Sequence, residues 1–96
     1  MATFITLINF TDQGIRNVKK SPRRAEQFRG LAENLGVSVK DIYWTVGSFD
    51  VVAIVEGSDE QVTAALLTLG ELGNVRTQTL RAYSGDEISR IIETMP

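Results

Sequence analysis

The chain has no cysteine and no histidine among its 96 residues, and it has only two prolines. Without cysteine it cannot form disulfides, thiolate nucleophiles or cysteine-based metal sites. Without histidine it lacks the side chain most used for acid–base catalysis near neutral pH, which is also the commonest transition-metal ligand. We therefore expect no catalytic constellation, no cofactor and no metal, and an enzyme becomes the less favoured class of protein.

Long hydrophobic runs are absent as well. The longest purely apolar run, residues 51–55, is far too short to cross a bilayer. The N-terminus lacks the charged region and the cleavage site of a secretory signal. With 43% hydrophobic and 23% charged residues, the composition is that of an ordinary globular protein. We expect one domain over residues 1–96, located in the cytoplasm, with no membrane partner.

The net charge of −2 conceals a basic stretch. Residues 16–29 carry a local charge of +5, and the rest of the chain carries −7. Such a stretch can attract anions or nucleic acid, but charges on the outer face of a helix are usually only solvated. No aromatic residue is interleaved with these basic residues as a base-stacking platform would require, so nucleic acid is not an expected partner.

Apolar periodicity divides the chain into four strands and three main helices. A serine opens each helix: Ser21 is expected as the N-cap before Pro22, and Ser58 and Ser84 are expected in capping boxes. The strands are expected at residues 3–10, 37–46, 49–56 and 74–83. The order is that of a ferredoxin-like βαββαβ sandwich, an α+β fold, with an extra C-terminal helix.

The most patterned stretch is YWTVGSFDVVAIVEGSD, residues 43–59. If Gly47 and Ser48 form a two-residue turn, Thr45 lies opposite Asp50 and Tyr43 lies opposite Val52. Alternation then gives the hairpin one wholly apolar face, which is expected to pack under the helices. That face consists of Ile42, Trp44, Val46, Phe49, Val51, Ala53 and Val55.

The opposite face of the hairpin carries Val52 and Ile54, which are unfavourable in water. On the first strand either Ile5 and Leu7, or their alternates Phe4 and Ile8, should join them. Two helices cover only one face of a four-stranded sheet, so the other face must be solvated, covered by the C-terminal helix, or buried against another subunit. A symmetric homodimer buries the same patch twice and is the expected solution, although a higher homo-oligomer is also possible.

The hairpin stretch resembles the signature of the GYD domain family, whose residues fall here on Gly47, Phe49 and Asp50. TDQGIRNVKKSPRRAE and VRTQTLRAYSGDE resemble the family's flanking segments, so the resemblance covers nearly the whole chain. Phe49 stands where the family has tyrosine, so no phenolic hydroxyl is present there. The resemblance implies a ferredoxin-like fold of the dimeric α/β-barrel kind, and little about activity. A weaker similarity connects the hairpin to the ligand-sensing domain of leucine-responsive-type regulators, which bind small amino acids near this turn at subunit interfaces.

Asp50 has three possible roles. It can fix the hairpin by accepting hydrogen bonds from backbone N–H groups or from Thr45, orient a ligand at an interfacial pocket, or act as a general base. A ligand site would consist of Tyr43, Thr45, Gly47 and Asp50, with Gly47 expected at positive φ.

Three functions remain open from the sequence. The favoured one is a homo-oligomeric module that binds a small ligand between subunits. The alternatives are a dimeric-barrel enzyme, either a cofactor-independent oxygenase or an isomerase, and a purely structural oligomer.

Overall fold

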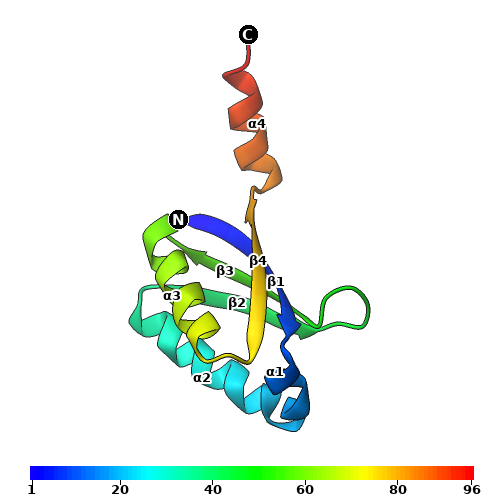
Figure 1. Cartoon of the computed structure of the whole chain (residues 1–96). Coiled ribbons are helices and arrows are strands. Elements are labelled where there is room, and N and C mark those ends of the chain that lie inside the picture. Colours follow the sequence, from blue (N-terminus) through cyan, green and yellow to red (C-terminus); the bar gives the residue numbers. More distant parts are fainter.

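The four strands form one antiparallel sheet in the order β2-β3-β1-β4, with the first and third strands in its centre (Figure 1). The computed structural model describes residues 1–96. This strand order, with helical crossovers between β1 and β2 and between β3 and β4, is the ferredoxin-like α+β arrangement that the sequence predicts. The strands are β1 (Ala2–Phe10), β2 (Ser38–Trp44), β3 (Val51–Gly57) and β4 (Val75–Ala82).

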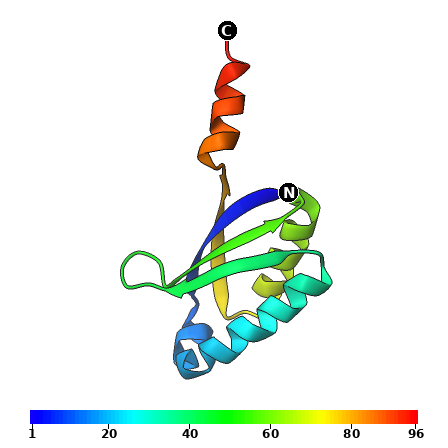
Figure 2. The same cartoon turned by 180° about the vertical axis from the view of Figure 1, so that it is seen from behind.

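Two long helices, α2 (Ser21–Asn34) and α3 (Asp59–Glu71), cover one face of the sheet. A short helix, α1 (Asp12–Arg16), and a 3₁₀ turn, η1 (Val18–Lys20), connect β1 to α2. The C-terminal helix α4 (Gly85–Glu93) continues from β4 and extends away from the rest of the chain (Figures 1 and 2). None of these helices combines the length and hydrophobicity needed to cross a bilayer.

The core lies between the sheet and the two long helices. Val51, Ala53 and Val55 of β3 alternate inward, as the period of a strand requires. The small residues Ala32 of α2 and Ala65 of α3 are both fully buried, so the two helices approach the sheet closely there. The remaining buried apolar residues are Ile8, Phe28, Val37, Val39 and Val62.

A β-bulge in β2 turns the apolar residues of this strand toward the helices. Val39 lies opposite Val55 and Asp41 lies opposite Ile54, so Lys40 is an extra residue in the strand. The bulge lets Val39 and Ile42 both face the helices, although strict alternation would put them on opposite faces.

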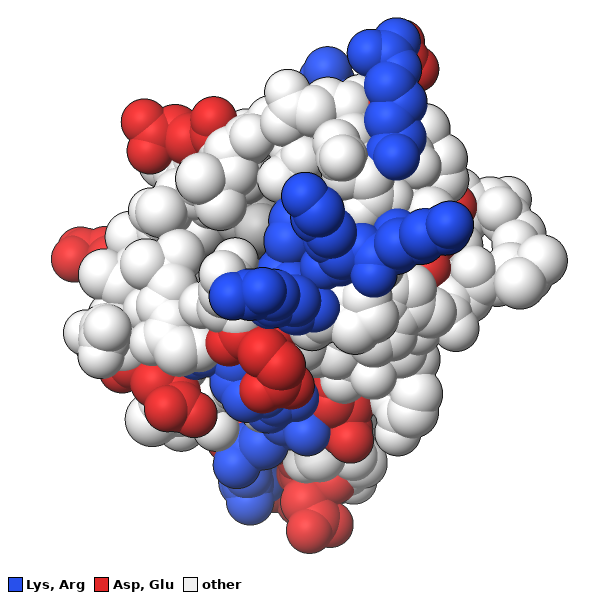
Figure 3. Space-filling model, turned by 90° about the horizontal axis from the view of Figure 1, so that it is seen from below, with Lys and Arg blue, Asp and Glu red and all other residues white.

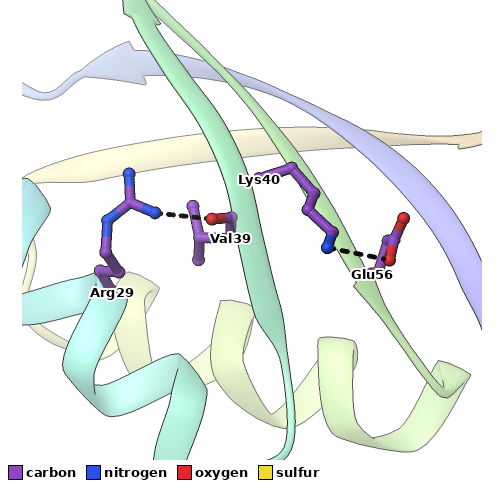
Figure 4. A network of polar contacts seen from close by, with 4 residues as sticks. All are labelled: Arg29, Val39, Lys40 and Glu56. Atoms are coloured by element: carbon purple, nitrogen blue, oxygen red, sulfur yellow. Dashed lines mark hydrogen bonds and ion pairs between the residues drawn. The ribbon is translucent and has the colours of Figure 1, made fainter.

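The surroundings of the bulge hold it in place (Figure 4). Nη1 of Arg29 donates to the carbonyl oxygen of Val39 at 2.6 Å, which fastens α2 to β2. The Lys40 ammonium lies 3.6 Å from the Glu56 carboxylate, and both side chains are accessible to solvent, so this ion pair adds little stability.

The helix starts confirm two of the three expected caps. The capping boxes of Ser58 with Gln61 and of Ser84 with Glu87 both form. The prediction that Ser21 is the N-cap of α2 is wrong: Lys20 holds the cap position without a side-chain hydrogen bond. Ser21 is buried instead, and its hydroxyl accepts a hydrogen bond from Nε1 of Trp44 at 3.0 Å.

The hairpin connection is longer than expected. Tyr43 pairs with Val52 and Trp44 with Val51 as predicted, but the ladder ends there. Residues 45–50 form a loop that extends away from the sheet (Figure 1), so the two-residue turn does not form. Val46 is therefore fully exposed rather than packed under the helices.

Candidate functional site

Asp50 joins the ends of three strands. Its backbone N–H donates to the Ile8 carbonyl at 2.9 Å, and its carbonyl accepts from the Thr45 N–H at 2.8 Å. Its carboxylate Oδ2 accepts the backbone N–H of Phe10 at 2.9 Å. The side chain is half-buried, so a charge-assisted hydrogen bond at this point stabilises the junction of β1 with the hairpin. These contacts favour the structural role of Asp50, with β1 supplying the donor.

Thr45 and Gly47 shape the loop itself. The Thr45 hydroxyl donates to the Phe49 carbonyl at 2.5 Å, and so it does not reach the Asp50 side chain. Gly47 has φ of +144°, a conformation that other residues rarely adopt, as expected from its place in the turn. A Cβ at Gly47 would meet no atom within 4 Å, because the loop is open to solvent. Both residues therefore serve the conformation of the loop.

The side chain of Tyr43 makes no hydrogen bond with the other three expected site residues. It stands on the open face of the sheet, opposite Val52, and its side chain is 58% exposed. Its hydroxyl lies 3.5 Å from the Asp41 carboxylate, a weak contact. Whether Tyr43, Thr45, Gly47 and Asp50 bind a ligand remains a prediction.

The open face of the sheet carries an apolar surface, which we call the open-face patch, with Asp41 beside Ile54 and Gln78 beside Leu7 at its edges. Pairing of Ile5 with Ile54 and of Leu7 with Val52 puts the first-strand residues on this face, so Ile5 and Leu7 are the correct choice. Their alternates Phe4 and Ile8 face the helices. No element of the chain covers the patch (Figure 2). It consists of Ile5, Leu7, Tyr43, Val52, Ile54 and Leu80.

Helix α4 presents a second apolar surface, the α4 stripe. Three stripe residues lie within the helix at the i, i+3 and i+4 spacing of one face, and the fourth follows just beyond the helix end; 41% to 65% of each side chain is exposed. The helix leaves the open-face patch uncovered and projects beyond the end of β4 (Figures 1 and 2). The stripe consists of Ile88, Ile91, Ile92 and Met95.

The first turn of α4 contains a carboxyl group whose pKa is shifted. The Ser84 backbone N–H donates to Oε1 of Glu87 at 2.9 Å, and this bond lowers the pKa of Glu87 below its ordinary 4.5. The hydrogen bond with the Ser84 side chain and the charges of Arg81 and Arg90 act in the same direction. The shift belongs to a helix cap, so it gives no sign of acid–base chemistry.

A cavity of about 500 Å³ lies on the helix side of the sheet. Its walls come from α2 between Ser21 and Leu31, the C-terminal end of α3 and the adjoining strand ends. Sequence reasoning missed it, because residues such as Phe28 and Trp44 have the spacing of ordinary core residues. The apolar lining includes Phe10, Phe28, Leu31, Ile42, Trp44 and Leu69.

A family model described as GYD domain matches residues 4–92. The chain belongs to the GYD domain family. A curated relative, the glutamine synthetase and cystathionine beta-lyase binding protein of Thermus thermophilus, is 37% identical over 94 residues, covering 95% of this chain and 99% of the relative.

Two solved structures are similar to this GYD domain in fold. FFRP-DM1 has a TM-score of 0.58 at 20% identity, covering 86% of this chain and 100% of the other. A hypothetical protein from Pyrococcus horikoshii has the same TM-score and identity, covering 88% of this chain and 92% of the other. At this identity the two likenesses show the fold alone.

Proposed function

We propose that this GYD domain is a homodimeric binding module that attaches to metabolic enzymes as an accessory protein. The observation that carries the proposal is the presence of two separate apolar surfaces, the open-face patch and the α4 stripe, on one small chain. Exposed apolar surfaces of this kind mark contacts with other proteins. We assign one surface to self-association and the other to the partner enzyme, and we place the protein in the cytoplasm.

The open-face patch suits self-association. Val52 and Ile54 lie in the middle of it beside Ile5 and Leu7, and burying each side chain fully is worth about 1.5–3 kcal/mol. A two-fold axis through the patch would bring identical surfaces together and bury it twice. Two such sheets facing each other form the dimeric α/β barrel implied by the family resemblance.

The α4 stripe suits a different partner. An amphipathic helix that presents anchors one turn apart, as Ile88, Ile91 and Ile92 do, is a common ligand for a hydrophobic groove on another protein. The helix extends clear of its own sheet, so a partner can reach the stripe without disturbing the fold (Figure 1). The name of the Thermus relative, which covers nearly the whole of this chain, supports an enzyme such as glutamine synthetase or cystathionine β-lyase as that partner.

The test measures binding of the purified chain to glutamine synthetase and to cystathionine β-lyase from the same organism, by biolayer interferometry. We expect Ile91→Asp to weaken binding about tenfold or more, because it places a charge in the middle of the apolar contact. Ser89→Asp is the matched control: it adds the same charge to the same helix outside the stripe, and it should bind like the parent.

Two results would count against the assignment. If the parent binds neither enzyme, the accessory role is rejected. If Ile91→Asp instead dissociates the homodimer while Ser89→Asp does not, the stripe contacts the second copy and the partner surface lies elsewhere.

We also propose a small-ligand site between the subunits, with fewer of the expected residues available to it. Tyr43 would line such a site, since it stands exposed on the open face, whereas Thr45 and Asp50 are already engaged in hydrogen bonds within the hairpin and with β1. The dimeric-barrel enzyme needs convergent polar groups on this face, whereas Asp41 and Gln78 stand on the two opposite edge strands, β2 and β4, with the apolar patch between them.

A further inference from the structure

The helix-side cavity is large for a chain of this size. The cavity is partly open to solvent, as the clefts that bind small molecules are. A volume of about 500 Å³ falls in the range of small-molecule sites. Most of its lining residues are apolar, and a few polar side chains join them, among them Ser21, Arg24 and Gln27.

Arg24 gives the cavity a fixed positive charge. Its Nη1 donates to the Asn17 carbonyl at 2.8 Å and its Nη2 to the Gly14 carbonyl at 3.3 Å, so the guanidinium is held in position by backbone oxygens. The side chain is half-buried. It has no carboxylate partner, since the only ion pair in the chain is the one between Lys40 and Glu56. The remaining N–H donors of the guanidinium can bind an anion.

The surroundings of Arg24 also favour an anion. The basic stretch of residues 16–29 carries a local charge of +5. Lys and Arg side chains gather on the lower end of the molecule, with some acidic side chains beside them (Figure 3). Clustered charge of one sign raises the local concentration of the opposite charge. An apolar cavity with one unneutralised cation at its wall is complementary to a molecule with an apolar body and one anionic group.

We propose that the helix-side cavity binds a small organic carboxylate with an aliphatic or aromatic body, its carboxylate on Arg24 and its body among Phe28, Trp44 and Leu69. The cavity lies across the sheet from the open-face patch. Ligand binding is therefore independent of the proposed dimer, and both can occur together.

Trp44 provides the measurement, because it is the single tryptophan and lines the cavity. Titration with octanoate should change its fluorescence and saturate. Octanol, which has the same chain without the charge, should bind more weakly, because it lacks the charge-assisted contact with Arg24. Acetate, which has the charge without the chain, should give no saturable signal because it buries too little apolar surface.

The role of the charge is tested with Arg24→Gln. This variant should weaken octanoate binding about tenfold or more, because it loses a charge-assisted hydrogen bond. It should leave octanol binding unchanged. Arg23→Gln is the matched control. It removes the same charge from the same helix at an exposed position outside the cavity, and it should bind octanoate like the parent. Thermal melting of each variant checks that α2 remains folded.

The position is tested with Ala25→Phe, which fills the cavity and should abolish the octanoate signal in a folded protein. Three results would overturn the proposal. They are a parent that shows no saturable octanoate binding, an equal loss of affinity in Arg23→Gln and Arg24→Gln, and full binding by a folded Ala25→Phe protein.

Discussion

Asp50 is the residue on which the ends of three strands depend. Its main chain bonds to Ile8 and Thr45, and its carboxylate holds the N–H of Phe10. Without the Asp50 carboxylate, the backbone N–H of Phe10 would lose its hydrogen-bond acceptor, because it lies where β1 ends. A buried or half-buried donor that loses its partner costs more free energy than an average hydrogen bond contributes.

Substitutions at Asp50 should separate acceptor from charge. Asp50→Asn keeps an oxygen that can accept the Phe10 N–H, so it should lower the free energy of unfolding by less than about 1 kcal/mol. Asp50→Ala removes the acceptor and should cost roughly 1–3 kcal/mol. Urea unfolding measures both, with Asp41→Ala as a near-neutral control because the Asp41 carboxylate makes only a weak contact with Tyr43. An Asp50→Ala protein as stable as the parent would contradict the structural role.

For single residues, the sequence predicted backbone conformation better than it predicted hydrogen-bond partners. The positive φ of Gly47 was predicted from a two-residue turn; the turn is a longer loop, yet the glycine still adopts a conformation that few other residues tolerate. The partner of Asp50 did not follow, because Phe10 lies 40 residues away and only the assembled sheet brings the two together. Ser21 was predicted to be a helix cap because its local sequence fits one. Its hydroxyl instead bonds to Trp44, a tertiary contact that only the folded chain creates.

Short-range sequence patterns predicted the starts of two helices correctly. Both capping boxes form because each joins residues three positions apart, so their geometry depends little on the rest of the chain. The bulge at Lys40 could not be predicted in this way, because it is needed only to bring Val39 and Ile42 to the same face of the finished sheet. The hairpin register was correct near the ladder and wrong at its tip, where Val46 has no packing to hold it.

The cap of α4 should respond to pH. The pKa of Glu87 in the folded chain lies below its ordinary 4.5, so the stabilisation is complete above pH 4.5 and is lost as the pH falls through the lowered pKa. Nuclear magnetic resonance should show the Glu87 carboxyl titrating below 4.5 and the helical chemical shifts of α4 decreasing together with it.

Glu87→Gln is the control for this titration. Gln61 fills the same position of the capping box in α3, so glutamine should preserve the α4 cap and remove its pH dependence in this range. If Glu87 titrates at 4.5 or higher, or if α4 loses helicity equally in both proteins, the cap does not control the helix.

The whole molecule is more extended than a closed monomer of its length. The radius of gyration is 14.6 Å, whereas about 12.5 Å is usual for a compact chain of this size. The projecting helix α4 accounts for the difference (Figure 1). The order of the sheet followed from the alternation of strands and helices, but the cavity and the direction of α4 did not, because both depend on how complete elements pack.

The open-face patch connects this shape to the proposed function. A chain that leaves Ile5, Leu7, Val52 and Ile54 on an uncovered sheet face needs a second apolar surface against it. We therefore propose that this GYD domain is a dimer built through that face.

Light scattering coupled to size exclusion measures the oligomeric state. The parent should have the mass of a dimer at micromolar concentration, and Ile54→Asp should have the mass of a monomer, because a charge in the centre of the patch cannot be buried. Leu67→Asp is the matched control, since Leu67 is exposed on α3 and lies away from the patch, and it should remain a dimer. A parent that is monomeric at this concentration would rule out the dimer, and an Ile54→Asp protein that stays fully dimeric would place the interface away from the open-face patch.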